Sequence, residues 1–291
     1  MFDRQKIIEY IEDKHLTDGG YFFAKVEPSG GLDTYLAVRI LKLLGIRPQK
    51  EESILTFWQK EEQEGNLDNI TGLFLWFGTL KELNYRLELS ESHRQLLTRH
   101  LQGKELLKKR TFQFTEKGKF GLYDTSPNTL YTDILEGELK ELFYLTTLLC
   151  DLKLDFNKQT IIDFVLSLQN NDGGFGQIRD SQISTTYYAL KILTLLSYPL
   201  KYLSNTAIYT KKEWLKVNYL EELYWVIESL VLLGQPLPSP EQVTLFLYDC
   251  RRDNGGFSRS RNMGISTIEY TYYAVSILVA YEHYFNKKII N

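Results

Sequence analysis

The sequence predicts an all-α protein in which a ring of outer helices surrounds a ring of inner helices. First, one phrase is written twice, because Asn171–Gly176 and Asp253–Ser258 each place a Gly-Gly pair before a phenylalanine. Second, each copy separates an amphipathic helical segment from one that is apolar on nearly all sides. Repetition on this scale is typical of folds built from stacked or ring-closed units.

Weaker copies of the phrase extend the repeat along the chain. The residue that follows each hinge serves as a marker, and the markers recur at intervals of roughly 40 to 55 residues. They are Tyr21, Leu67, Phe120, Phe175, Tyr219 and Phe257. The fifth unit has lost its glycines but still leads into an apolar run. We therefore expect about six helix pairs in a single domain that spans residues 1–291.

The segment before each hinge has the apolar spacing of a helix with one solvent-facing side, because apolar residues recur three and four positions apart. Such segments lie at 7–11, 54–58, 161–168 and 243–247. Helix start signals support several of them: Ser90 precedes an acidic residue, and Ser239 precedes Pro240. These segments are predicted to form the outer ring.

The segment after each hinge is apolar nearly all round, as in 190–196 and 230–233. A helix that is apolar on most faces is buried on most faces, so these helices are expected to form the inner ring around a central cavity. The glycines have a local reason, since the chain must stop, reverse and restart within a few residues. We expect the hinges to be structural and their aromatic residues to fill the gaps between helix pairs.

Composition and charge argue against several classes of protein. The net charge is −3 with dispersed Lys and Arg, which disfavours a nucleic-acid partner. The chain starts without the apolar stretch of a secretory signal and has no stretch typical of a membrane span. Cys150 and Cys250 form no disulfide framework and are expected to be buried rather than nucleophilic. We expect a cytoplasmic protein that is not transmembrane.

The segment Gly-Gly-Phe-Gly at 173–176, followed by Ser-Thr-Thr-Tyr-Tyr-Ala-Leu at 184–190, resembles a known repeat. It is similar to the repeat of the protein prenyltransferase β subunits and of the squalene and oxidosqualene cyclases. The resemblance covers essentially the whole chain, most strongly 158–197 and 239–281. It implies an (α/α)6 toroid of alternating outer and inner helices. Because a repeat motif specifies a scaffold, the activity has to be sought in other residues.

The family comparison disfavours a catalytic zinc. The protein prenyltransferases hold zinc with Asp and Cys, two residues apart, and with His at another inner helix. This sequence has Ser181 and Ile183 at the first two positions and Tyr270, or Glu269 after a one-residue slip, at the third. Of these only a glutamate is a usual zinc ligand. We expect no cofactor, although a magnesium–diphosphate complex stays open.

Two acidic residues are the candidate catalytic groups. The cyclases protonate an alkene with an Asp-x-Asp-Asp segment that is usually followed by Thr. Asp33 and Thr34 match the end of that pattern, whereas Leu32 replaces the acid that donates the proton. Asp33 and Glu269 both begin inner helices, so each could act as general acid or base. Alternatively, Asp33 caps its own helix.

Three arginines lie on hinge loops. Arg259 and Arg261 follow the glycines of the last hinge, and Arg179 occupies the matching loop of the fourth unit. In the prenyltransferases, basic residues on such loops bind the isoprenoid diphosphate, for which the guanidinium fork is well suited. The alternative is that they form ion pairs with acids of the rim.

Aromatic residues gather where the inner helices begin, and five of them are candidate substrate-binding residues. These are Tyr187, Tyr188, Trp225, Tyr270 and Tyr273. An aromatic-lined pocket would suit a polyprenyl chain and could stabilise a carbocation. The alternative, equally supported by the sequence, is that they belong to the core.

The leading hypothesis is therefore a terpene-cyclase-like or prenyltransferase-like enzyme, zinc-independent, that binds an isoprenoid (diphosphate) or similarly hydrophobic substrate in the central cavity. The alternative is a non-catalytic toroid that binds a peptide, a lipid or a protein partner. A cavity filled by its own aromatic side chains would favour that alternative. A glycan-processing toroid is a third possibility, which would need two carboxylates about 5–10 Å apart.

Overall fold

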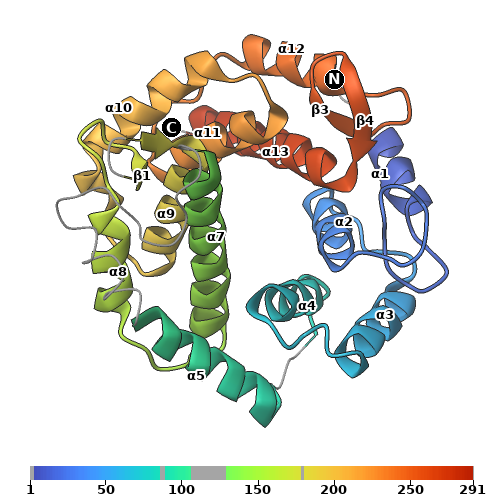
Figure 1. Ribbon diagram of the computed structural model, residues 1–291. Helices are drawn as coiled ribbons and strands as arrows, with labels where there is room; N and C mark the ends of the chain where they lie inside the picture. The colour runs from blue at the N-terminus through green and yellow to red at the C-terminus, as the bar shows by residue number, and fades with distance from the viewer. Residues whose placement is uncertain (1–2, 86–88, 106–128, 178–179, 291) are drawn as a thin grey trace.

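Two concentric rings of helices make up the protein in the computed structural model, which describes residues 3–85, 89–105, 129–177 and 180–290 (Figure 1). The inner ring consists of α2 (Gly31–Leu43), α4 (Ile70–Glu82), α7 (Thr129–Asp151), α9 (Ile183–Leu195), α11 (Leu220–Leu232) and α13 (Ile268–Ile290). The outer ring consists of α1 (Arg4–Asp13), α3 (Glu51–Gln63), α5 (Glu91–Glu105), α8 (Lys158–Ser167), α10 (Ser204–Glu213) and α12 (Pro240–Cys250). The predicted all-α double ring is confirmed. The third marker, Phe120, lies outside the described residues.

The inner ring is closed by contacts between neighbouring helices. Each inner helix packs against the next one along the chain, and α13 packs against α2. Because an outer helix that runs back lies between each inner helix and the next, the inner helices are parallel and begin at the same end of the barrel. We call this end the mouth.

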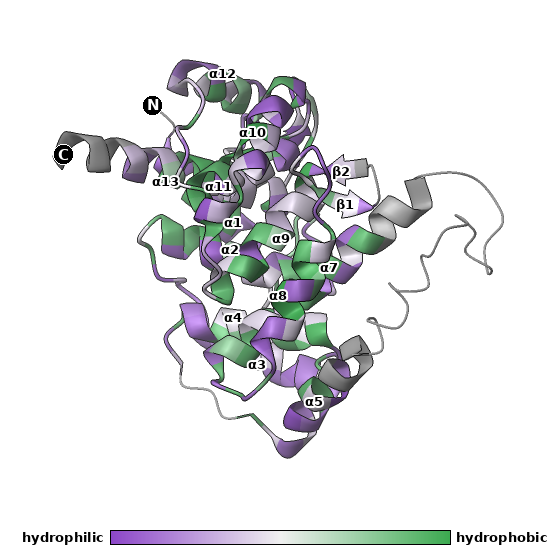
Figure 2. Cartoon of the chain, turned by 90° about the vertical axis from the view of Figure 1, so that its left-hand side faces the viewer, coloured by the Kyte–Doolittle hydropathy of each residue, from purple (hydrophilic) through white to green (hydrophobic). Residues whose placement is uncertain are grey.

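The outer helices are amphipathic, as the sequence predicts. In α1, Ile7, Tyr10 and Ile11 are buried while the acidic and basic residues lie outside the core. The expected start signal of α12 is present: Ser239 is its N-cap and Pro240 occupies its first turn. Hydrophilic residues alternate with hydrophobic ones along the outer helices, whereas green predominates on inner helices such as α4 and α7 (Figure 2).

The hinge of the fourth unit requires both of its glycines. Gly173 has a φ of +92°, and a Cβ there would lie 2.3 Å from the backbone of Asn205, at the start of α10. The aromatic residue that follows, Phe175, is fully buried, and its N–H donates to Thr186 Oγ1 at 2.9 Å. Thr186 in turn donates to Gln182 O at 2.7 Å. The hinge thus joins one helix pair to the next outer helix, as expected for a structural motif.

Units one and six repeat this arrangement. Tyr21 N donates to Thr34 Oγ1 at 3.0 Å, and Phe257 N donates to Thr271 Oγ1 at 3.1 Å. A Cβ on Gly255 would lie 2.2 Å from Lys6 O. Since Lys6 belongs to α1, the last hinge packs on the first outer helix and joins the two ends of the outer ring.

Two hinge loops contain short antiparallel hairpins that the sequence analysis does not predict. One pairs β1 (Phe175–Gln177) with β2 (Asp180–Gln182), and the other pairs β3 (Phe257–Ser260) with β4 (Met263–Thr267). Two single 3-10 turns, at Leu200–Tyr202 and Trp214–Lys216, flank α10. Across the described residues we find no helix with the length and apolar character needed to span a bilayer.

Candidate functional site in the barrel interior

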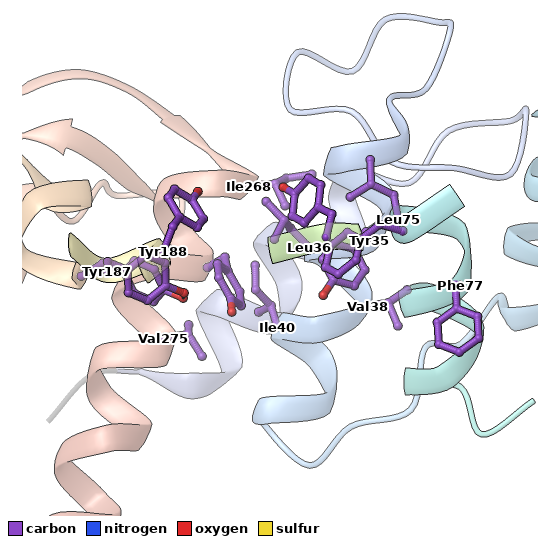
Figure 3. Packing of buried hydrophobic residues seen from close by; sticks show 14 of the residues in the cluster. Tyr35, Leu36, Val38, Ile40, Leu75, Phe77, Tyr187, Tyr188, Ile268 and Val275 are labelled. Atoms are coloured by element: carbon purple, nitrogen blue, oxygen red, sulfur yellow. The ribbon is translucent and has the colours of Figure 1, made fainter. Parts of the chain in front are cut away.

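An aromatic belt lines the middle of the barrel, and every inner helix contributes to it. We define the belt by its ring contacts; its members are Tyr35, Phe74, Phe143, Tyr144, Tyr187, Tyr188, Tyr224, Tyr272 and Tyr273. They lie about one turn into α2, α4, α9, α11 and α13, and about four turns into the longer α7. Figure 3 shows Tyr187 and Tyr188 on one side of this interior and Tyr35 on the other.

The ring contacts pass from helix to helix. Tyr35 meets Phe74 edge-on at 5.6 Å, and Phe74 stacks on Tyr144 at 3.9 Å between ring centroids. Phe143 lies 6.1 Å from Tyr188. The series continues from α9 through α11 to α13, where centroid distances of 5.4 and 4.6 Å link Tyr187 to Tyr224 and Tyr224 to Tyr273. The belt therefore connects all six inner helices.

Arg39 closes the belt between the last inner helix and the first. Its guanidinium lies 5.1 Å from the ring centroid of Tyr272 and 5.6 Å from that of Tyr35. Burial disfavours the charged form of Arg39, but the surrounding tyrosines and the carboxylate of Glu82 together raise the pKa of the guanidinium well above its usual value. A cation held between two ring faces gains cation–π attraction in a site of low dielectric constant.

The belt rings nearly fill the interior where they meet. The belt tyrosines on α2, α7, α9 and α11, and Tyr272 and Phe74, keep only 5–8% of their surface exposed. Two hydroxyls, those of Tyr187 and Tyr224, are 2.9 Å apart and hydrogen-bonded. This is the packing expected if the aromatics belong to the core.

Asp33 lies on the mouth side of the belt, in the first turn of α2. Its Oδ2 accepts from Phe23 N at 3.0 Å, so the carboxylate holds a hinge loop and does not cap its own helix. Burial, together with the negative charge of Glu269, raises the pKa of Asp33 to about 6. A carboxyl with this pKa is partly protonated near neutral pH and can donate a proton.

Glu269 is the second acid at the mouth and begins α13. Its Oε1 accepts from Tyr273 OH at 2.7 Å. The charge of Glu269 also acts on the hydroxyls of Tyr144 and Tyr188, which burial already keeps protonated. The two predicted catalytic residues lie in the first turns of α2 and α13, two inner helices that pack against each other.

The predicted arginines that the structure describes, Arg259 and Arg261, contact different parts of the molecule. Arg259 Nε pairs with Glu221 Oε1 at 2.6 Å, and its guanidinium lies 4.2 Å above the ring of Tyr219. Arg261 lies 4.4 Å above the ring of Phe246, on outer helix α12. Arg179 lies outside the described residues. The ion pair of Arg259 is the alternative that the sequence left open, and the role of the three arginines in diphosphate binding stays a prediction.

The five predicted aromatic residues fall into two groups. Tyr187, Tyr188 and Tyr273 are members of the belt. Tyr270 lies nearer the rim, where burial and the charges of Glu221 and Glu269 raise its pKa. Trp225 is half-buried and packs against the core beside the belt.

The positions that carry zinc in the prenyltransferases do not fit zinc in this chain. Ser181 Oγ donates to Asp172 Oδ1 at 2.7 Å and so belongs to the hinge, while the apolar Ile183 begins α9. Within the described residues no group of three or more His, Cys, Asp or Glu side chains could hold a metal ion. Cys250 is fully buried, and burial raises the pKa of its thiol to about 12, so it is not a nucleophile.

The sequence did not indicate three residues that lie among the inner helices: Arg39, Lys191 and Glu228. Each follows a belt tyrosine by four positions, at 35, 187 and 224, and therefore lies on the same helix face one turn deeper. Their spacing of four from a belt tyrosine is the only sequence feature that could have identified them. That spacing indicates an interior position only when the face of each helix that points inward is already known.

The comparisons with known proteins agree on the fold. The model of the prenyltransferase alpha-alpha toroid domain matches residues 1–74, 139–218 and 200–290, which is more than half of the chain. The chain belongs to this family. A search of the curated proteins found no match.

Among solved structures, the chain is similar to Candida albicans protein geranylgeranyltransferase-I complexed with GGPP. The TM-score is 0.62 at 14% identity, and the match covers 96% of this chain and 91% of the other. At this identity the likeness shows a shared prenyltransferase-like toroid.

Proposed function

We propose that this toroid binds an uncharged isoprenoid, or a similarly hydrophobic polyene, on the mouth side of the aromatic belt and protonates it with Asp33. The observation that carries the proposal is that Asp33 and Glu269 occupy the first turns of α2 and α13, which pack against each other at the mouth and each supply tyrosines to the belt. Family membership supports the class of substrate, because the similar solved protein was captured with an isoprenoid diphosphate.

The acid pair fits protonation of an alkene. A proton donor must be a neutral carboxylic acid in a largely dry environment. Asp33 fits because burial and the neighbouring Glu269 raise its pKa. Protonation of a carbon–carbon double bond leaves a carbocation, which the aromatic rings of the belt would stabilise by cation–π attraction. Tyr273, a member of the belt, donates a hydrogen bond to Glu269.

Glu269 is the base that completes the reaction in this proposal. Loss of a proton from the cation to a carboxylate restores a double bond, so the substrate is isomerised or cyclised without change in composition. The hydrogen bond from Tyr273 fixes the position of the Glu269 carboxylate. No metal is needed for this step.

The charges at the mouth favour an uncharged substrate over a diphosphate. The negative charge of Glu269 would repel an anion, and the positive charge of Arg259 is already matched by Glu221. The alternative, a diphosphate held by the hinge arginines, is tested in the experiment that follows.

The test is turnover in D2O with squalene and, separately, with geranylgeranyl diphosphate. We expect a product that carries one deuterium on carbon from squalene, and a loss of at least about 100-fold with Asp33→Asn. That variant keeps an oxygen to accept from Phe23 N. A product from geranylgeranyl diphosphate alone, abolished by Arg259→Ala but not by Asp33→Asn, would replace this proposal with the diphosphate form.

One observation favours a second function, a toroid that binds without catalysis. The belt rings touch in an unbroken series and leave little exposed surface. In that case neither squalene nor geranylgeranyl diphosphate would give a product. Calorimetry that detects binding of squalene without turnover would show a toroid that binds an isoprenoid but does not convert it.

A further inference from the structure

Two loops at the mouth carry the most exposed apolar side chains of the described residues. Leu215, Met263 and Ile265 lead the large hydrophobic side chains there in exposure, at 81%, 71% and 69%. Leu215 lies in the turn that precedes α11, and the other two lie on β4, which precedes α13. We call residues 211–219 and 257–265 together the rim surface. The function proposed above uses none of these three side chains.

Backbone pairing joins the two loops of the rim surface. Ser260 on β3 pairs with Met263 on β4 and also with Tyr219, just before α11. Since paired strands lie about 4.8 Å apart, Tyr219 and Met263 are about 10 Å apart across Ser260. Arg259 strengthens the junction, because its guanidinium lies 4.2 Å from the ring centroid of Tyr219 and its Nε pairs with Glu221. The rim surface is therefore one continuous part of the mouth.

The hairpin lies beside α12 and is held there by hydrogen bonds (Figure 1). Asn262 N donates to Asp249 O at 2.8 Å, near the end of α12, and Arg252 donates to Met263 O. These bonds fix the backbone of the turn, while the side chains of Met263 and Ile265 reach solvent. Large apolar side chains exposed together on an ordered backbone indicate a surface that meets a partner or a lipid phase.

The rim surface is basic although the protein as a whole is acidic. Its five cationic residues and single acid give it a formal charge of +4, whereas the whole chain carries −3. The acid, Glu213, pairs with Lys216, and within the described residues Lys212 and Arg261 make no ion pair. The turn at 249–253 next to it holds two acids and two arginines, which cancel. A positive surface on a negatively charged protein is attracted to an anionic surface and oriented by it.

We propose that the rim surface docks the protein on an anionic lipid bilayer. The side chains of Leu215, Met263 and Ile265 enter the boundary between head groups and acyl chains, and the lysines and arginines contact the lipid phosphates. Composition favours lipid over a protein partner, because lysine is depleted in protein–protein interfaces. The proposal goes beyond the function proposed above, because binding to a bilayer is measured without a substrate and does not depend on Asp33.

The first experiment is flotation of the full chain with vesicles of phosphatidylcholine, with and without phosphatidylglycerol. We expect phosphatidylglycerol to raise the partition coefficient by at least about tenfold, and high salt to remove most of this rise. No flotation with either kind of vesicle would overturn the proposal. Equal partition into both would also overturn it, because the charges of the rim surface would then play no part.

The second experiment tests the apolar contact. The double variant Met263→Ser, Ile265→Ser should lower partition into phosphatidylglycerol vesicles by about tenfold or more, since two apolar side chains no longer enter the bilayer. The matched control, Ile46→Ser with Val231→Ser, changes two exposed side chains at the ends of α2 and α11 away from the mouth and should leave partition unchanged. Thermal unfolding checks that both variants fold. Equal partition of the two variants would mean that a different face meets the lipid.

The third experiment tests the charges. Lys212→Gln with Arg261→Gln should reduce the preference for phosphatidylglycerol by about tenfold, because two cations no longer contact anionic head groups. An unchanged preference would contradict their role.

Sedimentation equilibrium without vesicles tests a different occupant, a second copy of the chain. We expect the same mass for the wild type and for the Met263→Ser, Ile265→Ser variant. A wild-type dimer that this variant dissociates would assign the rim surface to contact between two copies and overturn the proposal.

Discussion

Units one, four and six use the same hinge hydrogen bonds, whereas the six inner helices carry different side chains at equivalent depths of the barrel. In the hinges, Thr34, Thr186 and Thr271 each accept from the aromatic residue that follows the glycines. One turn below the belt, by contrast, α2 has an arginine, α9 a lysine and α11 a glutamate. Repeated residues in this protein hold the scaffold together, and the residues that vary between repeats are the ones available for chemistry.

The largest effect is expected at a hinge glycine. Gly173→Ala should reduce the free energy of unfolding by about 3 kcal/mol or more, since its Cβ would overlap the Asn205 backbone and φ is positive. Urea unfolding measures this loss. The control is Gly234→Ala, which has a φ of +63° but no atom within 4 Å, and should lose about 1 kcal/mol. Equal losses would mean that the close approach to Asn205 is not what the hinge requires.

The hinge threonine should rank next. Thr186→Val leaves the buried N–H of Phe175 without its acceptor and should cost about 2 kcal/mol in the same assay. Thr194→Val, on the exposed side of the same helix, is the control and should change stability by less than about 0.5 kcal/mol. A loss at Thr186 no larger than at Thr194 would contradict the assignment of the hydrogen bond to the scaffold.

Asp33 should show the opposite behaviour, because its buried carboxylate lowers the stability of the folded state once it is ionised. Its pKa is raised from 3.8 to about 6, so the folded state binds the proton more tightly than the unfolded state. Stability therefore falls as the pH rises from about 4 to 6. Asp33→Asn removes this dependence and should be more stable than the wild type by about 1–2 kcal/mol at pH 7.

Unfolding of the wild type and of Asp33→Asn at pH 4 and pH 7 measures this difference, and the comparison between the two proteins cancels the other titrating groups. If Asp33→Asn were less stable at pH 7, the ionised carboxylate would be a structural group, held by Phe23, and the comparison between hinge and interior would fail at this position.

The smallest effect is expected within the belt. Tyr187→Phe and Tyr224→Phe each break the hydrogen bond between the two hydroxyls and should cost about 1 kcal/mol or less. The double variant should cost less than the sum, because both partners of one bond are then absent. Additive losses would show that each hydroxyl has its own partner and that the belt is not coupled at this point.

Much of the scaffold could be predicted from the sequence, because its determinants are local. The Gly-Gly pairs, the apolar stripes of the outer helices and the cap at Ser239 all act within a few residues of themselves. The hairpins β1–β2 and β3–β4 were missed because their strands are short and lie in polar loops, where no alternation marks them.

The site could be predicted only in part. Asp33 and Glu269 could be selected because both occupy helix starts that the repeat defines, and the two helices, α2 and α13, are neighbours in the ring. Their catalytic role stays a prediction. Arg259 was chosen for its residue type, which does not reveal that Glu221, 38 positions earlier, already pairs with it. Arg39 was missed because an arginine inside a helix has no local mark that separates an interior face from a surface face.

The sequence by itself determined the repeat, the alternation of outer and inner helices and the place of the hinges, since each depends on residues near one another in the chain. Only the tertiary structure decided which side chains share the barrel interior. The belt brings Tyr35 and Tyr272 to the two sides of Arg39, although 237 positions separate the two tyrosines. Such contacts form only when the ring closes. They cannot be inferred from residues that are near one another in the chain.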